Sequence, residues 1–471
     1  MSRIVSGSIG FRFSPEGFVY ESSTNDIYQI NDEFNLLNLL GYLNTKIVSY
    51  ILEVTNPTIN VMPDDLRELP LSLKHLDIEP KVKQNITIAR EDWDVHETSW
   101  DFKTNEIIEM VRQARKDYPV DCVFEDKDGN IGSYPYPEPN FEMITFVKQY
   151  IEKWNEKFFK LHSNEEALNQ MFIKIYGLQD ELKPEVPLDE VTILQQGEIS
   201  FEPFNADTSN NYVLKGNNSC FVSSDNKVFR LGYDPRLAWH VDVIVKQFIS
   251  YAVGCMMGRY SIDKPGLILA NQGDGLAEYE AQVPDSHFEV DDDGIIPLMP
   301  SDTWFNDNAT LRFKRFLETV FGEGTLNNNL NFIEDSLGKS IDAYFVKDFW
   351  KDHKKMYQNR PIYWLFSSKK GAFQCIAYMH RMDAFTAERI RSKYLLPHIE
   401  WLVSKAQELE DLALLTALDR KQLDNLRQQI DECREYHDRL HTVADQQIAF
   451  DLDDGVLVNY AKFGNVLSKL K

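Results

Sequence analysis

Apolar residues recur every three or four positions between residues 36 and 51, which is the spacing of one face of a helix. The residues that carry this pattern are Leu36, Leu40, Leu43, Ile47 and Ile51. Asn56-Pro57 ends the predicted helix, because a residue before proline is disfavoured in the helical conformation. Residues 58–62 then predict a short strand, Pro63-Asp64 a turn, and residues 66–69 a return to packed structure. The segment predicts a compact unit without a nucleophile, a metal-ligand cluster or a phosphate-binding loop.

Helical and alternating patterns are mixed along the rest of the chain up to residue 350. Residues 1–30 predict a β-hairpin followed by a strand, residues 72–103 lack a regular period, and residues 118–140 are typical of a loop or small hairpin. Helices are predicted over 104–118, 141–182, 237–257 and, with a polar break at Asn327-Asn328-Asn329, over 310–350.

The C-terminal part predicts two hairpins of different kinds. Residues 362–366 and 372–378 read as paired strands with Lys369-Lys370-Gly371 as their turn. Residues 397–443 predict a long helical hairpin, in which Thr416 and Asp419 form a capping box for the second helix.

These patterns predict an α+β fold. A small mixed β/α unit precedes a mainly helical C-terminal region that contains a basic β-hairpin and a long helical hairpin. We expect four parts: a first unit over 1–80, a helical spacer with a loop insertion over 81–190, a mixed region with a buried helix and an acidic loop over 191–310, and a helical domain with the basic hairpin over 311–471.

The formal net charge of −24 argues against non-specific DNA binding by the chain as a whole. Charge is unevenly distributed, however. Residues 347–393 contain eleven Lys or Arg against four Asp or Glu, whereas residues 265–311 contain ten acids and no Lys or Arg. Because screening acts over about 8 Å at physiological salt, a basic face can act locally on an acidic protein. Basic residues with interleaved aromatics are typical of contacts with a phosphate backbone. The alternative is a hairpin whose lysines only solvate its rim.

Several other patterns are interpreted as structural. The Asp126, Asp128 and Asn130 spacing resembles a calcium loop, but Ile131 and Pro137 stand where that loop requires Gly and Glu. Arg236, His240 and Asp242 are interpreted as a helix start rather than an acid–base group. The acidic run at 291–293 is interpreted as a solvated face. Five scattered cysteines have no metal or redox spacing, and an N-terminus without an apolar signal core predicts a cytoplasmic protein.

Short motifs resemble one family. Residues 43–46, 56–60 and 65–70 (LNTK, NPTIN and DLRELP) resemble the target-recognition region of adenine-specific DNA methyltransferases. The tryptophan-containing segment 90–102, the "YGL" at 176–178, the "RPIYW" at 360–364 and the ending at 451–460 resemble PglX methyltransferases of BREX phage-exclusion systems.

The resemblance implies the C-terminal, non-catalytic portion of such an enzyme. An adenine methyltransferase needs a glycine-rich turn for S-adenosylmethionine and an Asn/Asp-Pro-Pro-Tyr/Phe tetrapeptide for the flipped base. The sequence has no Pro-Pro dipeptide, and Gly273-Asp274-Gly275 and Gly322-Glu323-Gly324 are not in a strand–turn–helix context. We therefore expect no catalytic, cofactor-binding or metal-binding residues here, with S-adenosylmethionine bound by a separate or missing catalytic half.

The expected partners are double-stranded DNA, that catalytic half and other phage-exclusion proteins, and no membrane. The candidate DNA-binding residues are Lys46, Asn60 and Arg67 for recognition, and Lys354, Lys355, Arg360, Lys369, Lys370 and Arg381 for phosphate. Two alternatives stay open: a docking module that does not touch DNA, and a self-sufficient methyltransferase.

Overall fold

The computed structural model describes most of the chain. The described residues are 9–15, 17–18, 23–29, 35–56, 58, 60–72, 76–118, 121–125, 131–135, 140–201, 221–222, 228–230, 237–412, 414–449 and 451–470. Much of the predicted N-terminal hairpin, all of the rejected calcium-loop positions 126–130, and Arg236 lie outside these residues.

The N-terminal unit contains two helices where the sequence predicted one. They are α1 (Leu36–Leu43) and α2 (Lys46–Thr55). The prediction of a single helix is wrong because Asn44 and Thr45 interrupt it: the Asn44 side chain bonds to the backbone of Phe11, and the Thr45 hydroxyl donates to the Tyr42 carbonyl at 2.7 Å. The predicted end at Asn56 is confirmed.

The strand predicted after α2 does not form in the described residues. Asn60 makes only an isolated bridge, and Pro63-Asp64 begins the helix α3 (Pro63–Arg67) instead of a turn. The Asp65 carboxylate accepts from the Met62 amide at 2.7 Å, which caps this helix in place of a continued strand.

The segment 72–103, predicted to be irregular, contains the helix α4 (Glu79–Asp94). Its apolar face is narrow, with Val82 and Ile88 as its buried apolar residues, and so the period was weak in the sequence. The helix predicted next is confirmed as α5 (Glu106–Lys116).

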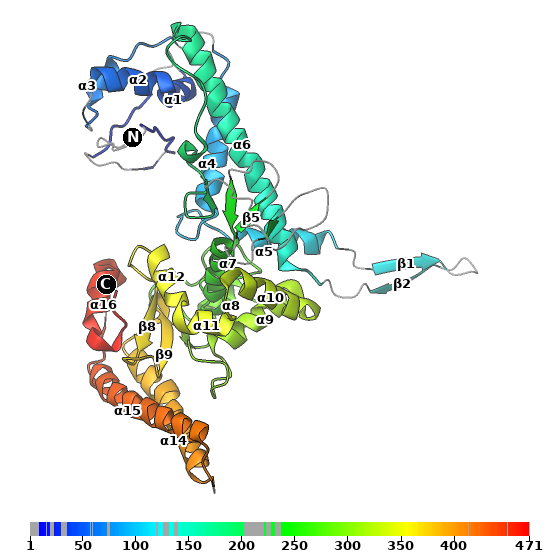
Figure 1. The fold of residues 1–471 in the computed structure, drawn as a ribbon, viewed down its shortest axis with the longest axis vertical. Helices are drawn as coiled ribbons and strands as arrows, with labels where there is room; N and C mark the ends of the chain where they lie inside the picture. Colours follow the sequence, from blue (N-terminus) through cyan, green and yellow to red (C-terminus); the bar gives the residue numbers. More distant parts are fainter. Residues whose placement is uncertain are drawn as a thin grey trace.

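A projecting hairpin and a long helix follow. Strands β1 (Asp121–Glu125) and β2 (Ile131–Pro135) pair antiparallel and extend away from the body (Figure 1). The helix α6 (Met143–Tyr176) has 34 residues and runs from the centre of the molecule to the N-terminal unit (Figure 1). It therefore joins the two parts of the fold.

The centre of the molecule is built on a small sheet and the buried helix α7 (Val241–Met256). The sheet has the order β3-β6-β5-β4 and is antiparallel throughout. Its strands are β3 (Ile199–Ser200), β4 (Phe221–Val222), β5 (Val228–Arg230) and β6 (Ala238–His240), and the 3-10 turn η1 (Leu188–Glu190) precedes them. Gly254 allows the ring of Tyr260 to pack on α7, since a Cβ there would lie 2.4 Å from that ring.

Shorter helices follow α7. They are α8 (Leu276–Gln282), α9 (Ala309–Phe321), α10 (Leu326–Leu337), α11 (Ile341–Lys347) and α12 (Phe349–Met356). Two of them, α9 and α10, pack on α7. The predicted break at Asn327-Asn328-Asn329 is wrong: it falls at Gly322 and the short turn η3 (Glu323–Thr325), and the asparagines lie inside α10. Asn329 is buried there, and its side-chain oxygen accepts from the Met143 amide at 2.8 Å.

Both predicted C-terminal hairpins are confirmed. Strands β8 (Tyr363–Ser367) and β9 (Gln374–Tyr378) pair antiparallel, and β7 (Ile295–Pro297) adds to β9. Helices α14 (Leu396–Glu410) and α15 (Ala417–Asp445) form the helical hairpin, and Thr416 and Asp419 make the predicted capping box. The remaining elements are the turn η4 (Met379–Arg381), α13 (Thr386–Arg389), the π-helix η5 (Ile390–Leu395), η6 (Leu452–Asp454), α16 (Val456–Lys462) and η7 (Gly464–Val466).

The buried apolar residues form two clusters. The smaller one joins α1, α2 and the end of α6, and the larger one runs from Ile88 to Leu467 through the sheets and the C-terminal helices. This mainly helical arrangement with small antiparallel sheets confirms the α+β class. No helix among the described residues combines the length and the apolar character needed to cross a membrane.

Candidate nucleic-acid interface

The three recognition candidates lie on the N-terminal unit. Lys46 begins α2, and its ammonium donates to the carbonyl of Glu185. Asn60 is exposed, and its carbonyl accepts from the Asn56 side chain at 2.9 Å. Arg67 forms an exposed ion pair with Asp64 at 2.6 Å. Arg67 and Asn60 therefore face solvent, whereas Lys46 fastens α2 to a neighbouring segment.

Three phosphate candidates meet at the end of α12. Lys354 and Lys355 occupy its last turn, where their charge also favours the helix terminus. The Lys354 ammonium lies 5.1 Å from the ring centre of Trp350. Arg360 follows after Gln358 and Asn359, which have positive φ angles of 51° and 61° and turn the chain toward β8. This tight turn places Arg360 beside the end of the helix.

The other two candidates, Lys369 and Lys370, form the exposed turn between β8 and β9. Glu432 of α15 holds this turn. One of its carboxylate oxygens accepts from the Ser368 hydroxyl at 2.6 Å and from the Lys370 amide at 2.6 Å. The backbone of the turn is therefore fixed while both ammonium groups remain at the surface.

The two basic groups lie at opposite ends of the buried β8–β9 hairpin. Arg360 precedes β8 and Lys369 follows it, and every residue of β9 is buried. An extended run between them spans at most about 30 Å. The hairpin thus presents two separate basic groups, rather than the single basic face expected from the sequence.

None of these five cations has a carboxylate partner within the described parts of the chain. Neighbouring basic residues do: Lys339 and Lys351 pair with Asp348, and Lys393 pairs with Asp292 and Asp293. The five unpaired residues are Lys354, Lys355, Arg360, Lys369 and Lys370. Their charge is available to an external anion.

Arg381, the ninth candidate, is not at the surface. Its side chain is buried, and its guanidinium donates to the backbone carbonyls of Asp291 at 2.7 Å and Asp292 at 2.8 Å. Burial lowers the pKa of Arg381, and the nearby carboxylates act in the opposite direction. The residue fastens the acidic loop, and we leave it out of the candidate interface.

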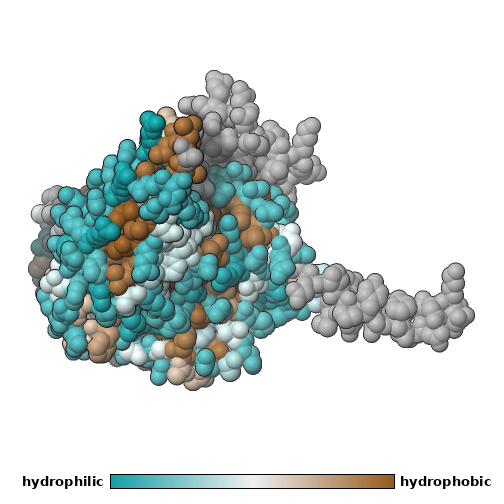
Figure 2. Space-filling model, turned by 90° about the horizontal axis from the view of Figure 1, so that it is seen from below, coloured by the Kyte–Doolittle hydropathy of each residue, from teal (hydrophilic) through white to brown (hydrophobic). Residues whose placement is uncertain are grey.

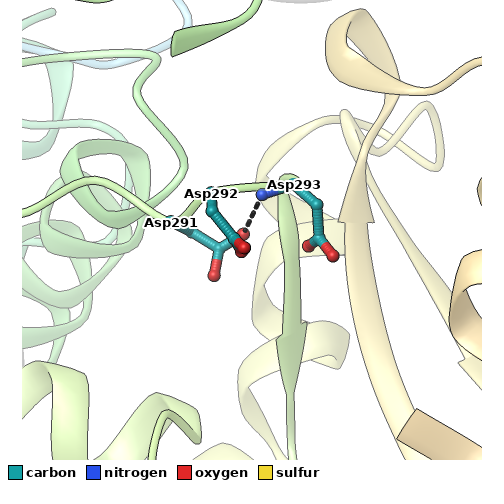
Figure 3. Close-up of side chains that lie close together, drawn as sticks. All are labelled: Asp291, Asp292 and Asp293. Atoms are coloured by element: carbon teal, nitrogen blue, oxygen red, sulfur yellow. Dashed lines mark hydrogen bonds between the residues drawn. The ribbon is translucent and has the colours of Figure 1, made fainter. Parts of the chain in front are cut away.

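The prediction of a solvated face for residues 291–293 is wrong for Asp291, whereas Asp292 is exposed and Asp293 is partly exposed. Asp291 is fully buried, and one of its oxygens accepts from the amides of Gly294 at 2.6 Å and Ile295 at 3.0 Å. The Asp293 amide donates to the same oxygen at 3.1 Å (Figure 3). The other oxygen pairs with Arg312 at 2.7 Å. The prediction failed for Asp291 because its partner, Arg312, comes from a distant segment of the chain.

The three aspartates are close enough to hold a metal ion, but their oxygens already have partners. The ligand atoms of Asp291, Asp292 and Asp293 lie within 4.8 Å of one another. Lys393 binds Asp292 and Asp293 at 2.9 Å each, and the Tyr394 hydroxyl donates to Asp293 at 3.0 Å. Internal cations therefore neutralise this cluster, and its hydrogen bonds connect the loop at 291–293 to residues 312, 393 and 394.

The interpretation of His240 and Asp242 as a helix start agrees with their positions. His240 is the residue before α7, and Asp242 lies in its first turn and pairs with Lys246 at 3.1 Å. Arg259, just beyond the end of α7, was not singled out in the sequence. Its only local signal is its place after Gly258, where φ is +77°.

No family model matches the chain. Over 98% of its length the chain is 34% identical to the adenine-specific methyltransferase BrxX of Escherichia coli O9:H4 (strain HS). It is 33% identical, again over 98% of its length, to the adenine-specific methyltransferase PglX of Lacticaseibacillus casei (strain Zhang). The matches span 35% and 34% of these relatives, respectively, so the chain corresponds to about a third of their length. The resemblance to PglX is thereby confirmed, and the chain is similar to about a third of each of these adenine-specific methyltransferases.

Proposed function

We propose that this chain is the DNA-contacting, non-catalytic C-terminal portion of a PglX-like, site-specific adenine-N6 DNA methyltransferase. Both relatives are named adenine-specific methyltransferases, and the chain corresponds to about a third of each. In this proposal the S-adenosylmethionine site and the base pocket belong to a separate or missing catalytic half. The complete enzyme acts in phage defence.

The strand arrangement supports a non-catalytic role. Nucleotide cofactors of open α/β sheets bind at the carboxyl ends of parallel strands. Every strand pair in the described residues is antiparallel. Gly322 ends α9 and Gly275 precedes α8, so the two glycine pairs noted in the sequence do not connect a strand to a helix.

The observation that carries DNA contact is the set of five unpaired cations at the two ends of the β8–β9 hairpin. Their maximum separation, about 30 Å, is of the order of one helical turn of DNA, about 34 Å. One helical turn of duplex is therefore long enough to reach both groups. Arg67 and Asn60 of the N-terminal unit would supply recognition, as implied by their place in the target-recognition motifs, and Lys46 would position α2.

The four parts over 1–80, 81–190, 191–310 and 311–471 remain our proposed domains. Three of them contribute to the larger apolar cluster, so we expect them to fold as one body. The first part has its own cluster with the end of α6.

A salt titration tests DNA contact. Binding of a labelled duplex is followed by fluorescence anisotropy as salt is raised. Each phosphate contact contributes about 0.9 to the slope of log K against log salt. The double variant Lys369→Ala/Lys370→Ala should therefore reduce the slope by about 2. Lys421→Ala, exposed on α15, is the control and should not change it. If the chain does not bind the duplex at low salt, the proposal is contradicted.

The alternative is a docking module of a phage-exclusion complex without DNA contact. Its supporting observation is the end of the helical hairpin, where Leu412, Leu414 and Leu418 are 48%, 86% and 72% exposed. Apolar patches also lie among hydrophilic residues on the face viewed from below (Figure 2). A tight complex with the catalytic half, together with no retention of DNA, would favour this function.

A further inference from the structure

Arg259 is held differently from the two buried arginines of the described chain, Arg312 and Arg381. Arg312 pairs with Asp291, and Arg381 donates to backbone carbonyls. Arg259 is only partly exposed, yet it donates to two phenol oxygens, those of Tyr260 at 3.0 Å and Tyr378 at 3.3 Å. No carboxylate within the described residues lies in ion-pair distance of it.

A guanidinium has five N–H donors, and these two bonds leave the others without a protein acceptor in the described chain. Removing such a group from water is costly unless an anion compensates it. Glu97, an acidic side chain of the same cluster, is bound by the Tyr357 hydroxyl at 2.9 Å and the Ser250 hydroxyl at 2.6 Å. Glu97 can balance the charge from a distance but does not saturate the donors.

Two further polar groups around Arg259 have no partner. The Tyr363 hydroxyl is fully buried and makes no hydrogen bond with any described residue, and the same holds for Nδ1 of His380. Both side chains pack on Tyr378: the Tyr363 ring lies 5.6 Å and the His380 ring 5.0 Å from its ring centre. Tyr378 therefore brings the guanidinium and both unpartnered groups to one place.

The cluster continues to the basic end of α12. His353 packs between Tyr363 at 4.6 Å and Tyr357 at 4.7 Å. Tyr357 directly follows α12, whose last turn carries the unpaired Lys354 and Lys355. An anion at Arg259 would thus lie beside an uncompensated positive surface, which favours a multiply charged oxyanion.

We propose that Arg259, with the Tyr363 hydroxyl, forms a phosphate-binding site in the tyrosine-lined cluster beneath the end of α12. Guanidinium groups bind phosphate in a bidentate manner, and a phenol hydroxyl donates a third bond. The phosphate is either a phosphodiester of duplex DNA or the phosphate of a small molecule. The DNA form of this inference rests on the proposed function; the small-molecule form does not.

The first test is a thermal-unfolding titration of the whole chain with inorganic phosphate at constant ionic strength. Phosphate should raise the melting temperature. Tyr363→Phe removes a hydroxyl that has no partner, so this variant should melt like the unmodified chain without phosphate and need at least tenfold more phosphate for the same shift. Arg259→Lys should also need more phosphate, because lysine keeps the positive charge but lacks the paired N–H donors of the guanidinium. Arg420→Gln, an exposed arginine of α15, is the control.

Absence of a phosphate effect, or a phosphate response in Tyr363→Phe and Arg259→Lys that equals that of the unmodified chain, would overturn the inference and leave Arg259 as a structural residue. A second arm identifies the source. If phosphate displaces a bound duplex more effectively than chloride of equal ionic strength, the site takes a DNA phosphodiester; if it binds without displacing DNA, the ligand is a small phosphate compound. Phosphate binding without any DNA binding would remove the proposed function and keep the site. Salt-dependent DNA binding without phosphate binding would keep the proposed function and remove the phosphate site.

Discussion

The Asp291 carboxylate accepts a hydrogen bond from the Arg312 guanidinium at 2.7 Å, and the two side chains are 0% and 10% exposed. Burial raises the pKa of Asp291 to about 7, while Arg312 acts in the opposite direction. The pair joins the loop before β7 to the first turn of α9. The run of three acids predicted that Asp291 would be exposed to solvent, but the tertiary structure buries its side chain.

Removing one partner of this pair should be costly. We expect Arg312→Met to lower the free energy of unfolding by about 3–5 kcal/mol, because Asp291 would stay buried without its cation. Asp291→Asn/Arg312→Met should cost less than the sum of the single variants, since neither charge is then left alone. Urea denaturation of the four proteins measures this coupling. Strictly additive losses would contradict it.

Three histidines, of which His353 and His398 are buried and His380 is partly buried, predict acid sensitivity. Burial lowers the pKa of His353 to about 3 and the pKa values of His380 and His398 to about 4. An unfolded histidine titrates near pH 6.5, so between these values the unfolded chain binds more protons than the folded one. The stability contribution is therefore complete above about pH 6.5 and is lost as the pH falls.

Each of these histidines contributes up to about 1.4 kcal/mol per pH unit within that window. Nε2 of His353 accepts from the amides of Ile362 at 3.2 Å and Tyr363 at 3.1 Å, a role that an uncharged amide oxygen can fill. In urea denaturation between pH 7 and pH 5, His353→Gln should therefore show a shallower decline than the unmodified chain. The same slope in both proteins would show that His353 does not titrate as described.

Glu432 holds the Lys369-Lys370 turn through hydrogen bonds, and substitutions can separate the effect of these bonds from the effect of the carboxylate charge. Glu432→Ala leaves the Ser368 hydroxyl and the Lys370 amide without their acceptor, and we expect a loss of about 1–3 kcal/mol. Glu432→Gln keeps a side-chain acceptor and should lose less. Chemical denaturation gives the stabilities. If alanine and glutamine are equally destabilising, the carboxylate charge matters more than the hydrogen bonds.

Arg381 and the exposed lysines should respond to substitution in different ways. Arg381→Ala removes a buried guanidinium that binds the backbone of Asp291 and Asp292, so it should lower the melting temperature without changing the salt slope of DNA binding measured below that temperature. Lys354→Ala/Lys355→Ala should reduce the slope and leave stability within about 0.5 kcal/mol. A reduced slope in a folded Arg381→Ala protein would return this residue to the interface.

Adding a methyl group just beyond the end of α7 offers a packing test. A Cβ at Gly258 would lie 2.7 Å from Leu269, and the backbone there has a φ of +77°. Gly258→Ala should therefore cost about 1–3 kcal/mol through overpacking and strain. Gly266→Ala, at φ +93° with no atom within 4 Å of the added carbon, is the matched control for backbone strain alone. Similar losses in both variants would argue against the packing term.

The sequence by itself determined the features that depend on neighbours within one or two turns. Apolar period, the Thr416–Asp419 capping box and the Lys369-Lys370-Gly371 turn predicted the helical hairpin and the β8–β9 hairpin, because capping and alternation act over three or four residues. Short motifs also identified the PglX resemblance. Where local side chains competed with the helix, as at Asn44 and Thr45, the period alone misled.

Only the tertiary structure decided which charges face water. Arg381 meets carbonyls 90 and 124 positions away in the chain, Asp291 meets Arg312 across 21 positions, and Arg259 meets Tyr378 across 119. Desolvation depends on these distant contacts, and no local pattern records them. For the same reason the basic stretch of the sequence became two separated groups, since the buried strands between them hold its ends apart.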